Sequence, residues 1–137
     1  MLHWLVIKKM SNPQLLEFKE QIKSQSESAN HAPDRQTRRL LLYLFTGTRG
    51  GYTRLRIVML LLQKPYNTYQ LSQKLEMDYK AVQHHMKVLV KNNLVSKIGE
   101  KYGALFYISS FLEYNIRALN EAIDKLEKKM NTKKVYL

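Results

Sequence analysis

The sequence predicts a mainly α-helical protein with one small β-hairpin, and three observations lead to this prediction. Apolar residues recur at helical spacing over much of the 137 residues. Two short runs rich in Val, Ile, Leu, Phe and Tyr, residues 94–98 and 104–108, are joined by a loop with a glycine at each end, which is typical of a hairpin. The sequence contains no cysteine, so disulfides and thiolate metal sites are excluded.

The N-terminal part of the chain is predicted to be a partly helical extension. A capping Ser-Asn pair before Pro13 is a helix-start signal, and apolar residues follow at helical spacing to about residue 23. The apolar run within residues 1–10 is shorter than the roughly 20 residues that a bilayer span needs. No membrane span is therefore expected, and the expected location is the cytoplasm. Residues 38–45 are apolar, but their pattern does not distinguish strand from helix.

Three helices are predicted in the centre of the chain. The first, over residues 53–63 with Thr53 as its cap, is apolar on nearly every side and is expected to be buried. The second, over residues 69–75, is short. The third, over residues 79–91, follows Asp78, which is a strong capping residue.

Three helices followed by a hairpin have the order of a winged helix-turn-helix. In that architecture the third helix enters the major groove of DNA, and the hairpin, called the wing, lies against the backbone or the minor groove. This DNA-binding domain is predicted to span residues 38–110. It is preceded by the extension, residues 1–37, and followed by a C-terminal helix within residues 111–137.

The charge is concentrated in the same central region. The whole chain has 23 Lys and Arg against 11 Asp and Glu, a net charge of +12. Residues 35–112 hold 13 basic and three acidic residues, whereas residues 1–34 hold four of each. This asymmetry indicates a surface that faces a polyanion. A merely solvated basic surface is the alternative.

The third helix carries its polar side chains on one face. Gln83 is expected to read adenine, and Lys80 or His84 to donate to guanine. Lys87 and Lys91 lie farther along the helix and are expected to meet phosphates. With the wing and the start of the first helix included, the predicted DNA-contacting residues are Tyr79, Lys80, Gln83, His84, Lys87, Lys91, Lys97, Lys101, Tyr102, Arg49, Arg54 and Arg56.

Residues 112–133 are predicted to form a helix with an apolar stripe. The six residues of this stripe are alternately four and three residues apart, which is the a/d pattern of a coiled coil. The pattern predicts a homodimer paired through Leu112, Ile116, Leu119, Ile123, Leu126 and Met130. The alternative is that the stripe packs on its own chain, for example against residues 13–23.

No spacing in the sequence matches a catalytic motif, so an enzyme is not expected. His84 and His85 point about 100° apart on a helix, which disfavours a shared metal ion. No metal, cofactor or small-molecule ligand is identifiable from the sequence.

Residues 52–109 resemble an ArsR-type winged helix-turn-helix. The stretch LEMDYKAVQHHMKVL, residues 75–89, matches the end of the second helix, the turn and the recognition helix of that family, and Asn93-Leu94-Val95 continues the match. Residues 48–51, 53–56 and 99–103 further resemble an archaeal branch of these regulators. The resemblance implies DNA binding as a homodimer and control of transcription. The family's metal sensing is not carried over, because its cysteine ligands are absent.

The sequence therefore predicts a transcription regulator that binds double-stranded DNA as a homodimer and is associated with the nucleoid. Two alternatives remain. One is a weakly specific chromosome-coating protein, which the broad positive charge would suit. The other is a winged-helix protein-interaction module, because a fold does not determine a function.

Overall fold

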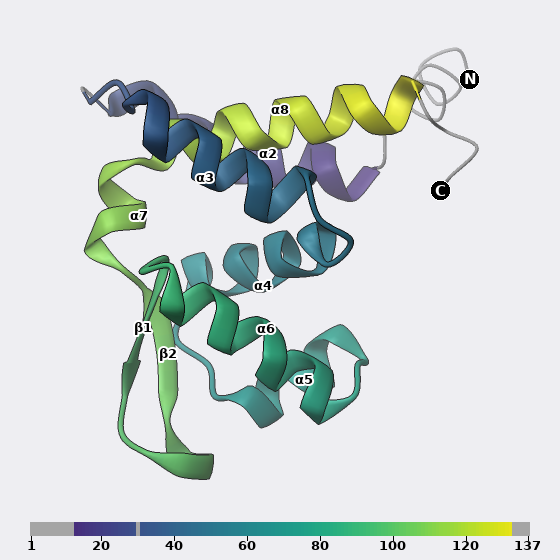
Figure 1. Cartoon of the computed structure of the whole chain (residues 1–137), viewed down its shortest axis with the longest axis vertical. Helices are drawn as coiled ribbons and strands as arrows, with labels where there is room; N and C mark the ends of the chain where they lie inside the picture. The colour runs from purple at the N-terminus through teal and green to yellow at the C-terminus, as the bar shows by residue number, and fades with distance from the viewer. Residues whose placement is uncertain (1–12, 30, 133–137) are drawn as a thin grey trace. The chain divides into compact units, whose positions relative to one another are not determined.

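The computed structural model describes residues 13–29 and 31–132, which belong to two compact units. Unit 1 takes the chain up to Thr48 and again from Asn115, and unit 2 is Arg49–Tyr114 (Figure 1). The predicted capping residues before Pro13 and the apolar run at the start of the chain lie outside the described residues. Within the described ranges, no helix combines the length and the apolar character that crossing a membrane requires.

Unit 1 consists of three helices, α2 (Pro13–Ser28), α3 (Arg35–Thr46) and α8 (Ile116–Thr132), with α8 packed against the other two (Figure 1). Residues 38–45, for which the sequence left strand and helix open, are helical. Asp34 caps α3 by accepting a hydrogen bond from the Thr37 amide at 2.8 Å.

Ion pairs join α8 to each of its neighbours in unit 1. Lys19 of α2 lies 2.9 Å from a carboxylate oxygen of Asp124 and 3.0 Å from one of Glu127. Arg38 of α3 lies 2.9 Å from a carboxylate oxygen of Glu121. The two carboxylates raise the pKa of Lys19 above its ordinary value, because they favour its charged form. These pairs are partly exposed, so each contributes little to stability.

The structure corrects the predicted coiled-coil seam. Ile116, Leu119, Ile123 and Leu126 are between 0 and 6 % exposed within a single chain, because α2 and α3 cover this face of α8. The predicted continuous helix is also two helices: α7 (Ser110–Tyr114) belongs to unit 2 and contains the buried Leu112. Leu112, Ile116, Leu119, Ile123 and Leu126 are therefore covered by their own chain, as the alternative to the coiled coil predicts, whereas Met130, the last residue of the predicted stripe, is half-buried.

Unit 2 has the predicted order of three helices and a hairpin. Its helices are α4 (Gly51–Gln63), α5 (Thr68–Leu75) and α6 (Tyr79–Lys91), followed by β1 (Val95–Ile98), β2 (Leu105–Ile108) and α7. The strands are antiparallel, in a register that pairs Val95 with Ile108 and Ile98 with Leu105. This arrangement is a winged helix-turn-helix. It starts at residue 49 rather than at the predicted residue 38, because α3 packs with α8 in unit 1.

A short bridge ties the α4–α5 connection to the wing. The Tyr66 amide donates to the Phe106 carbonyl at 3.2 Å, and the Phe106 amide donates to the Tyr66 carbonyl at 2.9 Å. Tyr66 therefore adds a one-residue edge to the hairpin beside β2. The bridge fixes the base of the wing against the helical part of unit 2.

The ends of α5 and α6 are set by local hydrogen bonds. Asn67 and Gln70 form a reciprocal capping box at the start of α5, with N–O distances of 2.8 and 2.9 Å. Glu76, at φ +53, takes the left-handed conformation that ends α5. Asp78 then accepts from the amides of the first turn of α6. The start of α4 differs from the prediction, because Gly50 occupies the cap position in place of Thr53.

Leu119→Ala is expected to lower the free energy of unfolding by about 2–5 kcal/mol, because it removes a fully buried side chain and leaves a cavity. Urea denaturation followed by circular dichroism measures the change. Lys125→Ala, on the exposed face of the same helix, is the matched control and should change it little. If the destabilisation of Leu119→Ala varied with protein concentration, Leu119 would lie between chains instead.

Candidate nucleic-acid interface

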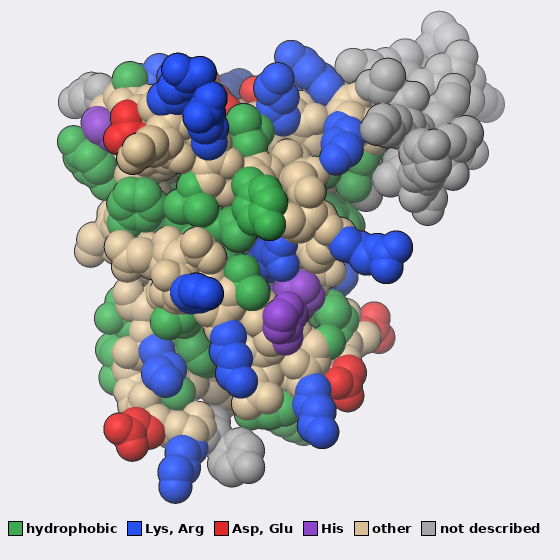
Figure 2. Space-filling view, viewed as in Figure 1, with side chains coloured by type: hydrophobic (Ala, Val, Ile, Leu, Met, Phe, Trp, Pro, Cys, Tyr) green, Lys and Arg blue, Asp and Glu red, His purple; other side chains and the backbone are tan. Residues whose placement is uncertain are grey.

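The polar face of α6 is exposed, and its apolar face is buried. Val82, Met86 and Leu89 are at most 2 % exposed and belong to the core of unit 2. The predicted contact residues Lys80, Gln83, His84, Lys87 and Lys91 are all exposed. Figure 2 shows Lys and Arg side chains spread over the face of unit 2 that carries α6, with Asp and Glu side chains towards its margins.

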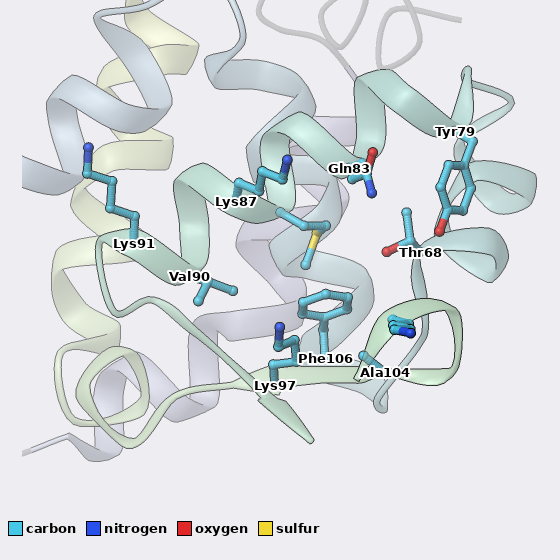
Figure 3. Close-up of a pocket in the computed structure, with 11 residues that line it drawn as sticks. Thr68, Tyr79, Gln83, Lys87, Val90, Lys91, Lys97, Ala104 and Phe106 are labelled. Carbon is cyan, nitrogen blue, oxygen red and sulfur yellow. The ribbon is translucent and has the colours of Figure 1, made fainter. Parts of the chain in front are cut away.

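A groove of about 700 Å³ runs between α6 and the wing (Figure 3). Its walls come from the exposed edge of α6 and from the hairpin, with Thr68 at the start of α5 closing one end. The lining residues are Thr68, Tyr79, Gln83, Met86, Lys87, Val90, Lys91, Lys97, Lys101, Ala104 and Phe106. The groove thus brings together residues that are separated by up to 38 positions in the sequence, from Thr68 to Phe106.

Lysines border the groove on both sides. Lys87 and Lys91 come from α6, and Lys97 and Lys101 come from the wing. No carboxylate lines the groove, and no ion pair within the described part of the chain involves these four ammonium groups. Like charges gathered without counter-charges repel one another, so the groove is a place where an anion is stabilised.

Lys101 occupies a position that would suit glycine. Its φ of +56 lies in the left-handed region, which costs a residue with a β-carbon roughly 1–2 kcal/mol. It begins the short 3-10 turn Lys101–Gly103 that forms the tip of the wing.

The floor of the groove is apolar. Met86, Ala104 and Phe106 are buried, whereas Val90 remains 36 % exposed at the edge. Figure 3 shows Val90 and Phe106 turned towards the space between helix and hairpin, while Lys91 points away from it. The sequence predicted the charged rim but gave no sign of this floor, because its residues come from both a helix and a strand.

The three predicted arginines have different environments. Arg49 is exposed, as a phosphate contact requires. Arg54 is only 5 % exposed, and its guanidinium lies 3.3 Å from His85 Nδ1. Arg56 is half-buried, and its Nε is buried without a hydrogen-bond partner among the residues that the structure describes. The predicted DNA contact of Arg54 is therefore corrected, since its side chain is directed into unit 2. The side chain of Tyr102 lies outside what the structure describes.

Arg54, His85 and Gly50 form a tight junction between α4 and α6. A β-carbon at Gly50 would lie 2.6 Å from His85 Cε1 and 2.8 Å from Arg54 Nη1, so a larger residue there would require one of these two side chains to move. Burial lowers the pKa of His85, and the neighbouring Arg54 and His84 lower it further. The sequence did not predict the contact of His85 with Arg54, which joins residues 31 positions apart.

No group of three or more potential metal-ligating side chains occurs within the described ranges. The exposed rim and the groove are instead suited to a polyanion. Together with the fold, they define unit 2 as a domain of the DNA-binding winged helix-turn-helix class.

The comparison with protein families makes this class more specific. Residues 52–97 match the family model described as bacterial regulatory protein, arsR family. Unit 2 therefore contains an ArsR-type helix-turn-helix, and this match supports a DNA-binding transcription regulator. The match spans α4, α5, α6 and the start of β1, and it leaves unit 1 outside the family model. A search of curated proteins finds no significant match.

Solved structures of similar fold include HlyU from Vibrio cholerae N16961, with a TM-score of 0.51 and 22% sequence identity over 69% of this chain and 97% of that one. Reduced HlyU from the same organism gives a TM-score of 0.49 and 23% identity over 66% and 90%. The adhesin competence repressor AdcR from Streptococcus pyogenes gives 0.45 and 20% over 72% of each chain. These likenesses concern the fold alone.

The lowered pKa of His85 predicts that stability falls in mild acid. The unfolded chain protonates His85 at its ordinary pKa of 6.5, whereas the folded chain holds it neutral to lower pH. The free energy of unfolding should therefore be highest above pH 6.5, fall as the pH drops through that value, and level off below the lowered pKa.

Urea midpoints at pH 7.5 and 5.5 measure this dependence. His85→Gln should remove most of the difference between the two midpoints, whereas His84→Gln should reduce it only slightly, because His84 is the smallest of the three causes that lower the pKa of His85. Equal pH dependence in wild type and His85→Gln would show that His85 is not the group responsible.

Proposed function

We propose that this protein is a transcription regulator that inserts α6 into the major groove of DNA and places the wing against the backbone or the minor groove. The observation that carries the proposal is the exposed polar face of α6 continuing into a lysine-bordered groove that no carboxylate lines. The arsR-family match of residues 52–97 supports the same function. We also propose that it acts in the cytoplasm, bound to the chromosome.

The exposed side chains divide into two kinds of contact. Gln83 carries the amide that can make a bidentate contact with adenine, and Lys80 and His84 on the same face can donate to guanine. Lys87 and Lys91, with the wing lysines, are assigned to phosphates. Tyr79, half-buried at the start of α6, is assigned to a phosphate or a thymine methyl. Arg49 and the exposed part of Arg56 extend the cationic surface.

The phosphate contacts predict a change in the salt dependence of DNA binding. Each of Lys87→Gln, Lys97→Gln and Lys101→Gln should lower the slope of log K against log salt by about 0.9, because one fewer counterion is released. Fluorescence anisotropy of a labelled 30-base-pair duplex at several KCl concentrations measures the slope. Lys125→Gln, on the exposed face of α8, is the control and should keep the wild-type slope.

Gln83→Ala should behave differently from the lysine variants. It is expected to weaken binding to a selected site by about 1–3 kcal/mol and to leave the salt slope unchanged, because a base contact is lost and no phosphate contact. The site is first selected from genomic fragments by footprinting with the native protein. Negligible affinity for every duplex at physiological salt would contradict the proposal and favour a protein-interaction module.

A weakly specific chromosome-coating protein is the second candidate function. It is favoured by the breadth of the positive charge, since residues 35–112 carry a net charge of +10. Binding to the selected site and to a random duplex is compared at one salt concentration, because specific regulators bind their sites about 10³–10⁷ times more tightly. A ratio near one, with diffuse genome-wide footprints, would favour the coating function.

We propose that the protein binds DNA as a homodimer, with an interface outside the buried stripe of α8. The resemblance to ArsR-type regulators supports a dimer, whereas the burial of Leu119 and Ile123 excludes the interface predicted from the sequence. Sedimentation velocity of the free protein and of its DNA complex is expected to give two chains per duplex site. One chain per site at saturating protein would contradict it.

A further inference from the structure

The groove between α6 and the wing has an apolar floor, of which Val90 is the most exposed residue. Its floor consists of Met86, Ala104 and Phe106, with Val90 exposed at its edge. A sugar-phosphate strand is charged and strongly hydrated, so it needs the lysines but not a hydrocarbon floor. The floor therefore points to a ligand with an apolar body.

The rim of the groove determines the sign of that ligand's charge. Lys87 and Lys91 on the helix side and Lys97 and Lys101 on the wing side line the groove, although Lys91 points away from its interior, and no carboxylate is among the lining residues. A neutral apolar molecule would leave these ammonium groups without a counter-charge, whereas an anion would neutralise part of their repulsion. Ammonium groups donate three hydrogen bonds and pair readily with carboxylates.

The size and polar groups of the groove fit a small molecule. Its volume of about 700 Å³ lies within the range of roughly 300–1,000 Å³ that small-molecule sites occupy. Thr68, Tyr79 and Gln83 lie together at one end, as Figure 3 shows, and offer hydroxyl and amide groups. An apolar floor with a few convergent polar groups is the usual composition of such sites.

We propose that this groove binds a small amphipathic anion, a carboxylate with an apolar body, and that the bound anion excludes DNA. The apolar body lies over Val90 and Phe106, and the carboxylate pairs with the wing lysines Lys97 and Lys101. Because Gln83 and Lys87 belong both to the groove and to the DNA-contacting face, one ligand blocks the other. The anion site stands on the groove itself, whereas the exclusion of DNA rests on the proposed function.

Isothermal titration calorimetry with sodium decanoate, below its micelle concentration and without DNA, tests the site. Decanoate is expected to bind saturably with one molecule per chain. Acetate lacks the apolar body and decan-1-ol lacks the charge, so both should bind at least about tenfold more weakly. Equal binding of decanoate and decan-1-ol, or of decanoate and acetate, would overturn the proposal.

Variants locate the binding in the groove. Lys97→Gln combined with Lys101→Gln should weaken decanoate binding about tenfold or more, and Val90→Glu should abolish it by placing a carboxylate at the edge of the floor. Lys74→Gln is the matched control, because Lys74 is exposed in the same unit, lies over the Tyr66 ring and does not line the groove. Circular dichroism confirms that each variant is folded. Unchanged binding in both groove variants would overturn the site.

Competition with DNA separates this inference from the proposed function. Decanoate should displace a labelled duplex, whereas acetate at the same ionic strength should not. Binding of decanoate in the groove without binding of any duplex would support the anion site and contradict the proposed function. Binding of duplex without binding of decanoate would support the proposed function and overturn the anion site. Simultaneous binding of both ligands would overturn the exclusion.

Discussion

The orientation of α6 depends on the burial of one apolar face. Val82, Met86 and Leu89 are spaced three and four residues apart, so they share a side of the helix, and all three are held in the core of unit 2. Rotating α6 by one residue, about 100°, would expose these side chains and bury lysine ammonium groups at a large cost in desolvation. The Asp78 cap fixes where the helix begins. The cationic face of α6 is therefore exposed because the opposite, apolar face must be buried.

The same burial also forms the groove beside the helix. Met86 is part of the core, yet it reaches the floor where α6 meets the wing, next to Phe106. Phe106 is in turn held by its backbone bridge to Tyr66. Folding therefore creates an apolar floor under a lysine rim. One surface can in this way serve both a polyanion and a small anion, and competition between them would need no conformational change.

Unit 1 shows how an apolar stripe can have two interpretations. The alternation of four and three residues in α8 suits a coiled-coil partner, but α2 and α3 of the same chain cover that stripe completely at Leu119 and Ile123. The ion pairs of Lys19 and Arg38 are partly exposed and contribute little to stability. The apolar stripe is what holds unit 1 together.

Local signals in the sequence determined the winged helix-turn-helix, its Asp78 cap, the boundaries of α6 and the exposure of Lys80, Gln83 and Lys87, because capping, periodicity and charge act within one or two helical turns. Only the tertiary structure decided three other features. They are the helical state of residues 38–45, the burial of Arg54 against His85, and the partner of the α8 stripe. Each depends on contacts between segments far apart in the chain, and a one-dimensional pattern states that a face is apolar without stating what will cover it.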